Sequence, residues 1–157
     1  LLSDVIALLS NVYIAADKAE TALDIFKSGV ETDPSNKYFH YNYGVLLLKG
    51  NNFEKALDQF NAALAIDSTY EGALYNLAVG YVNWGVYIRE TAPEPTKVET
   101  SIKEKFKLAL PYLGRMTRLK PQDPEAWELL GKVYANLGMS KEATATFEKA
   151  DKLRKQQ

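Results

Sequence analysis

The chain has 157 residues, of which 46% are hydrophobic and 25% are charged, with a formal net charge of −1. These values are typical of one globular domain that can bury a core without disulfides or a structural metal. The near-neutral charge argues against a general nucleic-acid binder, and the absence of cysteine excludes disulfides, thiol catalysis and cysteine metal sites. No apolar run approaches the roughly 18 residues that would predict membrane insertion.

An amphipathic pattern is already running at the start of the chain, which begins with Leu1 instead of Met. This start predicts an excised domain or a processed form of a longer protein. The N-terminal end is apolar and looks uncapped, which suggests either upstream repeats or a partner at this end. The residues concerned are Leu1, Leu2, Val5, Ile6 and Leu9.

A 34-residue period runs through the chain. It relates Ala22 to Ala56, Phe26 to Phe60, and Tyr13 to Leu47 and Tyr81. The next step, from Tyr81 to Tyr134, is 53 residues, so 19 extra residues interrupt the third repeat. The period predicts one domain, 1–157, with repeats at about 3–36, 37–70, 71–123 and 124–157.

Each repeat carries the pattern of two short amphipathic helices. Small residues recur where two helices are expected to cross closely: Gly44, Ala78 and Gly131 at one position, and Ala22, Ala56, Ala109 and Ala143 at another. Large residues such as Phe60 and Phe147 fill the spaces between the helices. Because one helix pair cannot bury its own apolar face, neighbouring pairs are expected to stack.

The last repeat carries a recognisable signature. It reads Trp127, Leu130-Gly131, Tyr134, Ala143 and Phe147, the pattern W-x2-L-G-x2-Y followed by A-x3-F. On these residues the chain resembles the tetratricopeptide repeat family over essentially its whole length. The resemblance implies an all-α, right-handed solenoid of antiparallel helix pairs, with about eight helices and no sheet.

The extra residues of the third repeat fall at 86–104. Only Thr91 to Thr96, with Pro93 and Pro95, breaks the helical pattern, so both helices of this repeat are expected to run about two turns past their neighbours. Pro111 lies inside the second of these helices and predicts a kink near Lys107. The elongated hairpin could contact a partner or a second copy, or could simply lengthen the helix pair.

The sequence around this hairpin, with its "ALPYL" run at 109–113, resembles tetratricopeptide proteins of Bacteroidetes-type bacteria. Many such proteins look exported. The resemblance therefore leaves both the cytoplasm and a bacterial periplasm open as compartments.

The sequence offers no enzyme signature. The only histidine, His40, stands where the repeat places a large packing residue, and no second imidazole or thiol could share a metal with it. Acid pairs such as Glu142 and Glu148 lie among lysines on helix faces, and the glycines are scattered singly. We therefore expect a non-catalytic protein without cofactor or metal.

The family resemblance implies that a partner binds on the concave face formed by the first helix of each repeat. The matching positions include Asn11, Tyr38, Tyr41, Asn42, Val45, Tyr75, Asn76, Val79, Asn83 and Lys132. Tyrosines offer flat apolar area with a hydroxyl, and asparagines can bond the backbone of an extended peptide. The alternative is that the tyrosines pack against a neighbouring helix.

One family use, a carboxylate clamp for chaperone tails, matches only in part. Asn11 and Asn42 agree with its asparagines, but Ala7, Gly72 and Asn76 replace its cations. This departure argues against chaperone-tail binding.

Charge is uneven along the chain, with an acidic segment at 1–36 and a basic one at 97–120. The primary hypothesis is a module that binds a peptide or helix of another protein in its groove. The second is a scaffold that self-associates through its terminal helices or the third-repeat hairpin, and a distant third is RNA binding by the basic segment.

Overall fold

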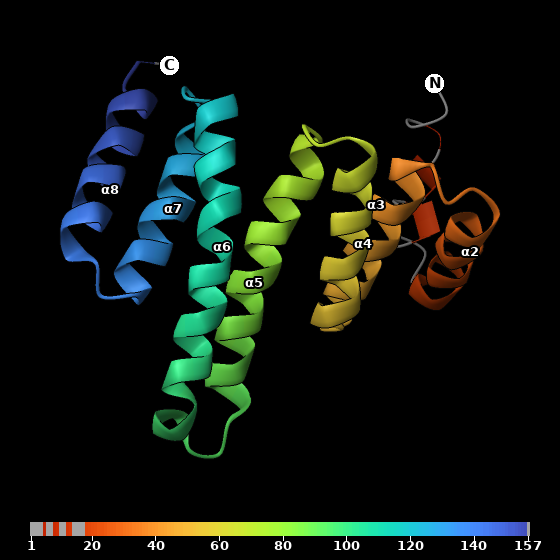
Figure 1. Cartoon of the computed structure of the whole chain (residues 1–157), viewed down its shortest axis with the longest axis horizontal. Coiled ribbons are helices and arrows are strands. Elements are labelled where there is room, and N and C mark those ends of the chain that lie inside the picture. The colour runs from red at the N-terminus through yellow and green to blue at the C-terminus, as the bar shows by residue number, and fades with distance from the viewer. Residues whose placement is uncertain (1–4, 6–7, 10–11, 14–17, 157) are drawn as a thin grey trace. The chain divides into compact units, whose positions relative to one another are not determined.

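The computed structural model describes residues 5, 8–9, 12–13 and 18–156 (Figure 1). These residues form seven α-helices and one 3-10 helix, with no strand among them, which confirms the all-helical expectation. The helices are α2 (Ala19–Thr32), α3 (Lys37–Lys49), α4 (Phe53–Ile66), α5 (Glu71–Thr91), η1 (Pro95–Val98), α6 (Glu99–Leu119), α7 (Pro124–Asn136) and α8 (Ser140–Arg154). Residues 5, 8–9 and 12–13 are also helical, at the place of the first expected helix.

The chain divides into two compact units, residues 1–76 and residues 77–157. The first unit contains α2, α3, α4 and the first turns of α5. The second contains the rest of α5 together with η1, α6, α7 and α8. Each unit has its own packed interior and is described by itself.

In the first unit, α3 and α4 pack closely because a glycine faces an aromatic ring. A Cβ atom at Gly44 would lie 2.7 Å from Cε1 of Phe60, whose side chain is fully buried. The helices are joined by a tight turn in which Asn51 has a positive φ of 57° and the amide of Asn52 donates to the carbonyl of Leu47. Asparagine tolerates this left-handed conformation better than most residues.

The turns between helix pairs repeat one chemistry. The Asp33 carboxylate accepts hydrogen bonds from the Ser35 hydroxyl at 2.8 Å and the Asn36 amide at 3.2 Å. Thirty-four residues later, Asp67 accepts from the backbone N–H and the hydroxyl of Thr69. Aspartate is favoured at such turns because its short carboxylate bonds to groups two or three residues ahead.

The second unit is built around a buried cluster contributed by α5, α6 and α7. Its fully or nearly fully buried members are Ala78, Ile102, Phe106, Ala109, Leu113, Leu130 and Val133. The last helix pair repeats the packing of the first unit, since a Cβ atom at Gly131 would lie 2.8 Å from Cε1 of Phe147. The small and large positions of the 34-residue period therefore meet in space as expected.

The elongated helical hairpin of the third repeat is confirmed. Helices α5 and α6 have 21 residues each, against 13 to 15 in α2, α3, α4, α7 and α8, and their joined ends extend past the ends of α7 and α8 (Figure 1). The chain leaves α5 at Thr91 and re-enters a 3-10 turn at Pro95, where the prolines were expected to break the helix. Gly85 lies at the contact of the two long helices, where a Cβ atom would meet the carbonyl oxygen of Ile102 at 3.4 Å, an ordinary van der Waals distance.

Helix α6 continues through Pro111 without a break. Proline has no N–H, so the carbonyl of Lys107 loses its usual partner one turn later. The kink expected at this point stays a prediction.

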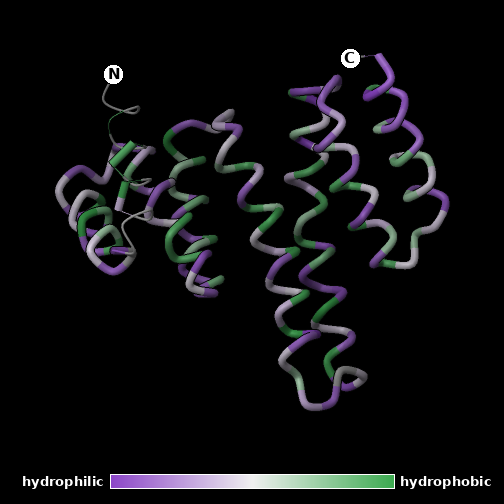
Figure 2. The backbone as a smooth tube through the Cα atoms, turned by 180° about the vertical axis from the view of Figure 1, so that it is seen from behind, coloured by the Kyte–Doolittle hydropathy of each residue, from purple (hydrophilic) through white to green (hydrophobic). Residues whose placement is uncertain are grey.

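Every described helix carries both polar and apolar residues. In the view of Figure 2, hydrophobic and hydrophilic residues mix along each helix, and none is hydrophobic from end to end. Among the described residues, no helix combines the length and the hydrophobicity that crossing a membrane requires.

Candidate interaction surface

Tyrosine and asparagine side chains gather on one part of the first unit. Tyr38, Tyr41 and Val45 recur at helical spacing on α3, while Tyr75 and Asn76 lie in the first turns of α5. We name these five residues the tyrosine–amide surface. They are five of the ten residues that the family resemblance implied.

Tyr41 is half-buried against the start of α5. A Cβ atom at Gly72 would lie 3.0 Å from Cε2 of the tyrosine ring, so the glycine makes room for it. The amide of Asn76 donates to the Tyr41 hydroxyl at 3.1 Å and also to the Gly72 carbonyl at 3.1 Å. Burial raises the pKa of the Tyr41 hydroxyl, and the bond from Asn76 partly opposes that rise. The hydroxyl is therefore protonated and held in place at neutral pH.

A second ring, Tyr70, holds Tyr38 and Tyr41 together. The ring centroids of Tyr41 and Tyr70 are 5.1 Å apart, those of Tyr38 and Tyr70 are 5.9 Å apart, and both pairs meet edge to face. The ring centroids of Tyr41 and Phe60 are 6.0 Å apart. Burial raises the pKa of Tyr70. Part of the surface of Tyr38 and Tyr41 is thus packed against other rings of the first unit, and only the remainder is available to a partner.

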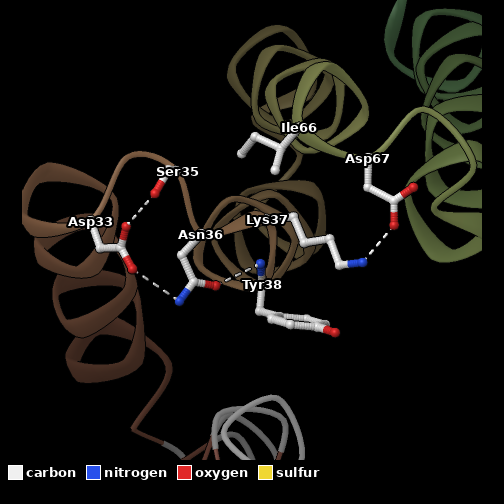
Figure 3. A pocket seen from close by; sticks show the side chains of 7 residues that line it. All are labelled: Asp33, Ser35, Asn36, Lys37, Tyr38, Ile66 and Asp67. Atoms are coloured by element: carbon white, nitrogen blue, oxygen red, sulfur yellow. Dashed lines mark hydrogen bonds and ion pairs between the residues drawn. The ribbon is translucent and has the colours of Figure 1, made fainter.

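Lys37 lies next to Tyr38 and extends toward Asp67 (Figure 3). Its Nζ lies 2.5 Å from Oδ2 of Asp67. The same atom lies 5.2 Å from the ring centroid of Tyr38 and 4.9 Å from that of Tyr70. The ion pair raises the pKa of Lys37 and lowers that of Asp67. Lys37 therefore fixes the turn after α4 against the start of α3.

The depression beside Lys37 has a volume of about 390 Å3 and is lined by Asp33, Ser35, Asn36, Lys37, Tyr38, Ile66 and Asp67. Figure 3 shows that its polar side chains bond to one another or to the Tyr38 backbone N–H. These contacts give the depression a structural role at the junction of two turns.

Sequence reasoning missed Tyr70, Lys37 and Asp67. The only available signal was periodic, because Tyr70 and Asp67 follow Asn36 and Asp33 by one 34-residue step. Their importance comes from contacts across the fold, which the pattern does not contain.

The remaining implied residues of the first unit differ in exposure. Tyr75 is 42% exposed, whereas Asn42 is buried and its amide donates to the Tyr38 carbonyl at 2.8 Å. Asn42 therefore stabilises α3 itself in this structure. Asn11 lies outside the described residues.

Three implied residues belong to the second unit. Val79 is half-buried on α5, and Asn83 is exposed on the same helix. Lys132 is exposed on α7, with its Nζ 2.5 Å from Oε1 of Glu128, and Arg154 of α8 bonds the other oxygen of that carboxylate. These two cations lower the pKa of Glu128 to about 2.

His40 is a satisfied core residue, as the sequence indicated. It is buried, with Nε2 2.9 Å from the Pro34 carbonyl and Nδ1 2.8 Å from the Gln59 side chain. A carbonyl only accepts, so Nε2 donates its N–H to Pro34. No grouping of metal-ligating side chains occurs in the part of the chain that the structure describes.

Comparison with protein families gives two matches. Models described as tetratricopeptide repeat match residues 8–71 and residues 124–157. In the sequence, one segment precedes the elongated hairpin and the other follows it.

Two curated relatives are named peroxisomal targeting signal receptor. The protein from Kluyveromyces lactis is 28% identical over 79 residues, and that from Candida glabrata is 27% identical over 84 residues. The matches cover 50% and 54% of this chain but only 14% of each relative.

Solved structures share the fold over nearly the whole chain. A crystal structure of MamA has a TM-score of 0.77 at 20% identity, covering 98% of this chain and 73% of that one. MamA from Desulfovibrio magneticus RS-1 has a TM-score of 0.74 at 19% identity, covering 99% and 77%. The thermophilic TPR protein TTC0263 of Thermus thermophilus has a TM-score of 0.70 at 22% identity, covering 96% and 74%. Identities this low establish a shared fold alone.

Proposed function

Because the chain belongs to the tetratricopeptide repeat family, a fold of protein–protein interaction modules, we propose that it binds a peptide or helix of a partner protein on the tyrosine–amide surface. The observation that carries the proposal is the exposure of Tyr75. Tyr75 is a large aromatic side chain, 42% exposed, that follows Gly72 by one helical turn, and Gly72 is the residue against which the Tyr41 ring packs.

The surface is arranged before any partner arrives. Tyr41 is fixed by the Asn76 bond and by ring contacts, so its ordering costs little additional entropy on binding. Tyrosine loses few rotamers for a large contact area, and its hydroxyl can bond a partner backbone. The packed ring of Tyr41 and the exposed Tyr75 together offer the residue types that are typical of a binding hot spot.

The names of the curated relatives are consistent with this proposal. They describe receptors of a peroxisomal targeting signal. The matched part is a small share of those proteins, so we carry over only the class of ligand, a segment of a partner chain. The proposal includes Val79, Asn83 and Lys132 of the second unit, each to be tested by its own substitution.

The test begins with selection of binders to the native chain from a displayed library of random 12-residue peptides. A selected peptide, synthesised with an amidated C-terminus, is then titrated by calorimetry into the native chain, Tyr75→Ala and Tyr87→Ala. Tyr87 is an equally exposed tyrosine on the same helix, at 42%, and serves as the matched control.

We expect Tyr75→Ala to weaken binding by about tenfold or more, the effect of losing an interface hot spot, and Tyr87→Ala to change it less than twofold. Equal affinities of native chain and Tyr75→Ala, with both variants melting as the native chain does, would contradict the proposal. Failure to select any peptide would contradict it as well.

A second candidate function is self-association through the N-terminal helical residues. Val5, Leu8 and Val12 recur at helical spacing and are 57%, 64% and 54% exposed. Leu8→Lys should then convert a concentration-dependent dimer into a monomer in analytical ultracentrifugation. A native chain that stays monomeric to high micromolar concentration would rule this candidate out.

A further inference from the structure

The elongated hairpin builds a depression of its own in the second unit. It has a volume of about 290 Å3 and is lined by Arg89, Thr96, Glu99, Ile102, Lys103 and Asn136. Five of these six residues belong to segment 86–104, the residues that the 34-residue period identifies as additional. The depression thus depends on the feature that distinguishes the third repeat.

Arg89 is fixed in this depression by two neutral groups. Its Nη2 donates to Oδ1 of Asn136 at 2.9 Å, and its guanidinium carbon lies 5.5 Å from the ring centroid of the fully buried Phe106. Asn136 is itself held by a 2.8 Å bond from its amide to the Lys132 carbonyl. The guanidinium is therefore oriented without a carboxylate on either of these sides.

The other charges of the depression balance each other. Nζ of Lys103 lies 2.6 Å from Oε1 of Glu99, and this pairing lowers the pKa of Glu99. The two groups form an ion pair of zero net charge. The charge left on the lining is that of Arg89, so the lining carries one net positive charge.

We propose that this depression, which we name the Arg89 site, binds the side-chain carboxylate of an aspartate or glutamate in the partner segment. Arginine presents five N–H groups in a planar fork, and Asn136 occupies one of them. The others can take a carboxylate in the paired geometry that arginine favours. The inference rests on the proposed function, because the carboxylate must belong to a bound partner.

The test uses peptides selected on the native chain, all with amidated C-termini so that side chains are the only carboxylates. Each peptide is compared with versions in which one acidic residue is replaced by its amide. Both are titrated into the native chain, Arg89→Gln and Lys107→Gln. Lys107 is an exposed cation on the same hairpin outside the lining, so its variant controls for the loss of one positive charge.

We expect Arg89→Gln to weaken binding of the acidic peptide by about fivefold, which is in the range for a well-oriented but exposed ion pair. Binding of the amide version should be unchanged. Lys107→Gln should affect both versions equally. The inference is overturned if the selected peptides lack acidic residues, or if Arg89→Gln weakens both versions alike. Loss of binding in Tyr75→Ala together with no effect of Arg89→Gln would retain the proposed function and reject the Arg89 site.

Discussion

At the scale of single residues, the helix pairs are held together by matched small and large side chains. Gly44 faces Phe60 in the first unit, and Gly131 faces Phe147 in the second. In the third repeat the corresponding residues are Ala78 and Leu113, which belong to one buried cluster. Ala78 carries a Cβ atom where Gly44 and Gly131 have none, and its counterpart Leu113 is smaller than the phenylalanines of the other two repeats.

This matching gives a direct prediction for Gly44→Ala. The added Cβ would lie 2.7 Å from the buried Phe60 ring, so the helices must move apart, and we expect a loss of about 1–3 kcal/mol in the free energy of unfolding. Adding Phe60→Leu should recover part of the loss by creating the alanine–leucine pair of the third repeat. Urea denaturation of the single and double variants measures both effects.

Gly114→Ala is the control, because its Cβ would meet only the flexible end of Arg118 at 3.6 Å. We expect this variant to gain about 0.5–1 kcal/mol from the better helix propensity of alanine. A Gly44→Ala variant that behaves like Gly114→Ala would show that the helix contact is looser than described.

The sequence alone predicted these packing positions but not the polar contacts. Glycine, alanine and phenylalanine recur with the 34-residue period because every repeat needs the same close crossing. The bond of Arg89 to Asn136 spans 47 residues and joins the additional segment of the third repeat to the fourth repeat, so periodicity carries no sign of it. Asn42 had the right residue type and spacing for a groove, yet its amide bonds its own helix, since an asparagine's partner depends on local side-chain geometry.

At the scale of helices, α6 contains an unusual proline. Pro111 is exposed and lies in the middle of a 21-residue helix, where proline costs up to about 3 kcal/mol relative to alanine. We expect Pro111→Ala to raise the free energy of unfolding by about 2 kcal/mol, because it restores a hydrogen bond to the Lys107 carbonyl. Chemical denaturation measures the change. A destabilised variant would show that the surrounding packing requires the bend that proline imposes.

Helices α7 and α8 are linked by a carboxylate whose effect on stability depends on pH. Lys132 and Arg154 lower the pKa of Glu128 from 4.5 to about 2 in the folded chain. A lowered folded-state pKa stabilises the fold above the unfolded value, and this contribution disappears as the pH falls through about 2. The stability difference between native chain and Glu128→Gln should therefore be constant above about pH 5 and shrink between pH 4.5 and 2.

Denaturation curves recorded across this range test the prediction, with Glu148→Gln on the exposed surface of α8 as the control. A difference that does not vary with pH would show that the two cations do not act on Glu128 in solution. High salt should reduce the difference at every pH, because the groups are exposed to solvent.

The helical elements themselves were largely predictable. The break at Pro93 and Pro95 and the apolar spacing on both sides were sufficient to predict the long hairpin, since proline and helical periodicity are strong local signals. The sequence did not indicate that the end of α7 would meet the hairpin at Arg89. That meeting depends on how far α5 continues, and helix ends are set by tertiary contacts as much as by local sequence.

At the scale of the whole molecule, the chain forms two compact units, residues 1–76 and 77–157. In repeat proteins, stability is approximately a sum of local terms and nearest-neighbour contacts. We therefore expect Gly44→Ala to accelerate amide hydrogen exchange in α3 and α4 while leaving protection in α7 and α8 within about a factor of two. Exchange measured by mass spectrometry decides this, and a uniform loss of protection would indicate a single cooperative unit.

The paired small and large residues also bear on how the chain avoids misassembly. Helices from different repeats resemble one another and could pair wrongly while the chain emerges from the ribosome. A first helix carrying Ala78 cannot accept Phe60 in the geometry of Gly44, and Leu113 against Gly44 would leave a void. The alanine–leucine pair is thus complementary to itself and not to the glycine–phenylalanine pairs, which favours pairing of the two helices of the third repeat with each other.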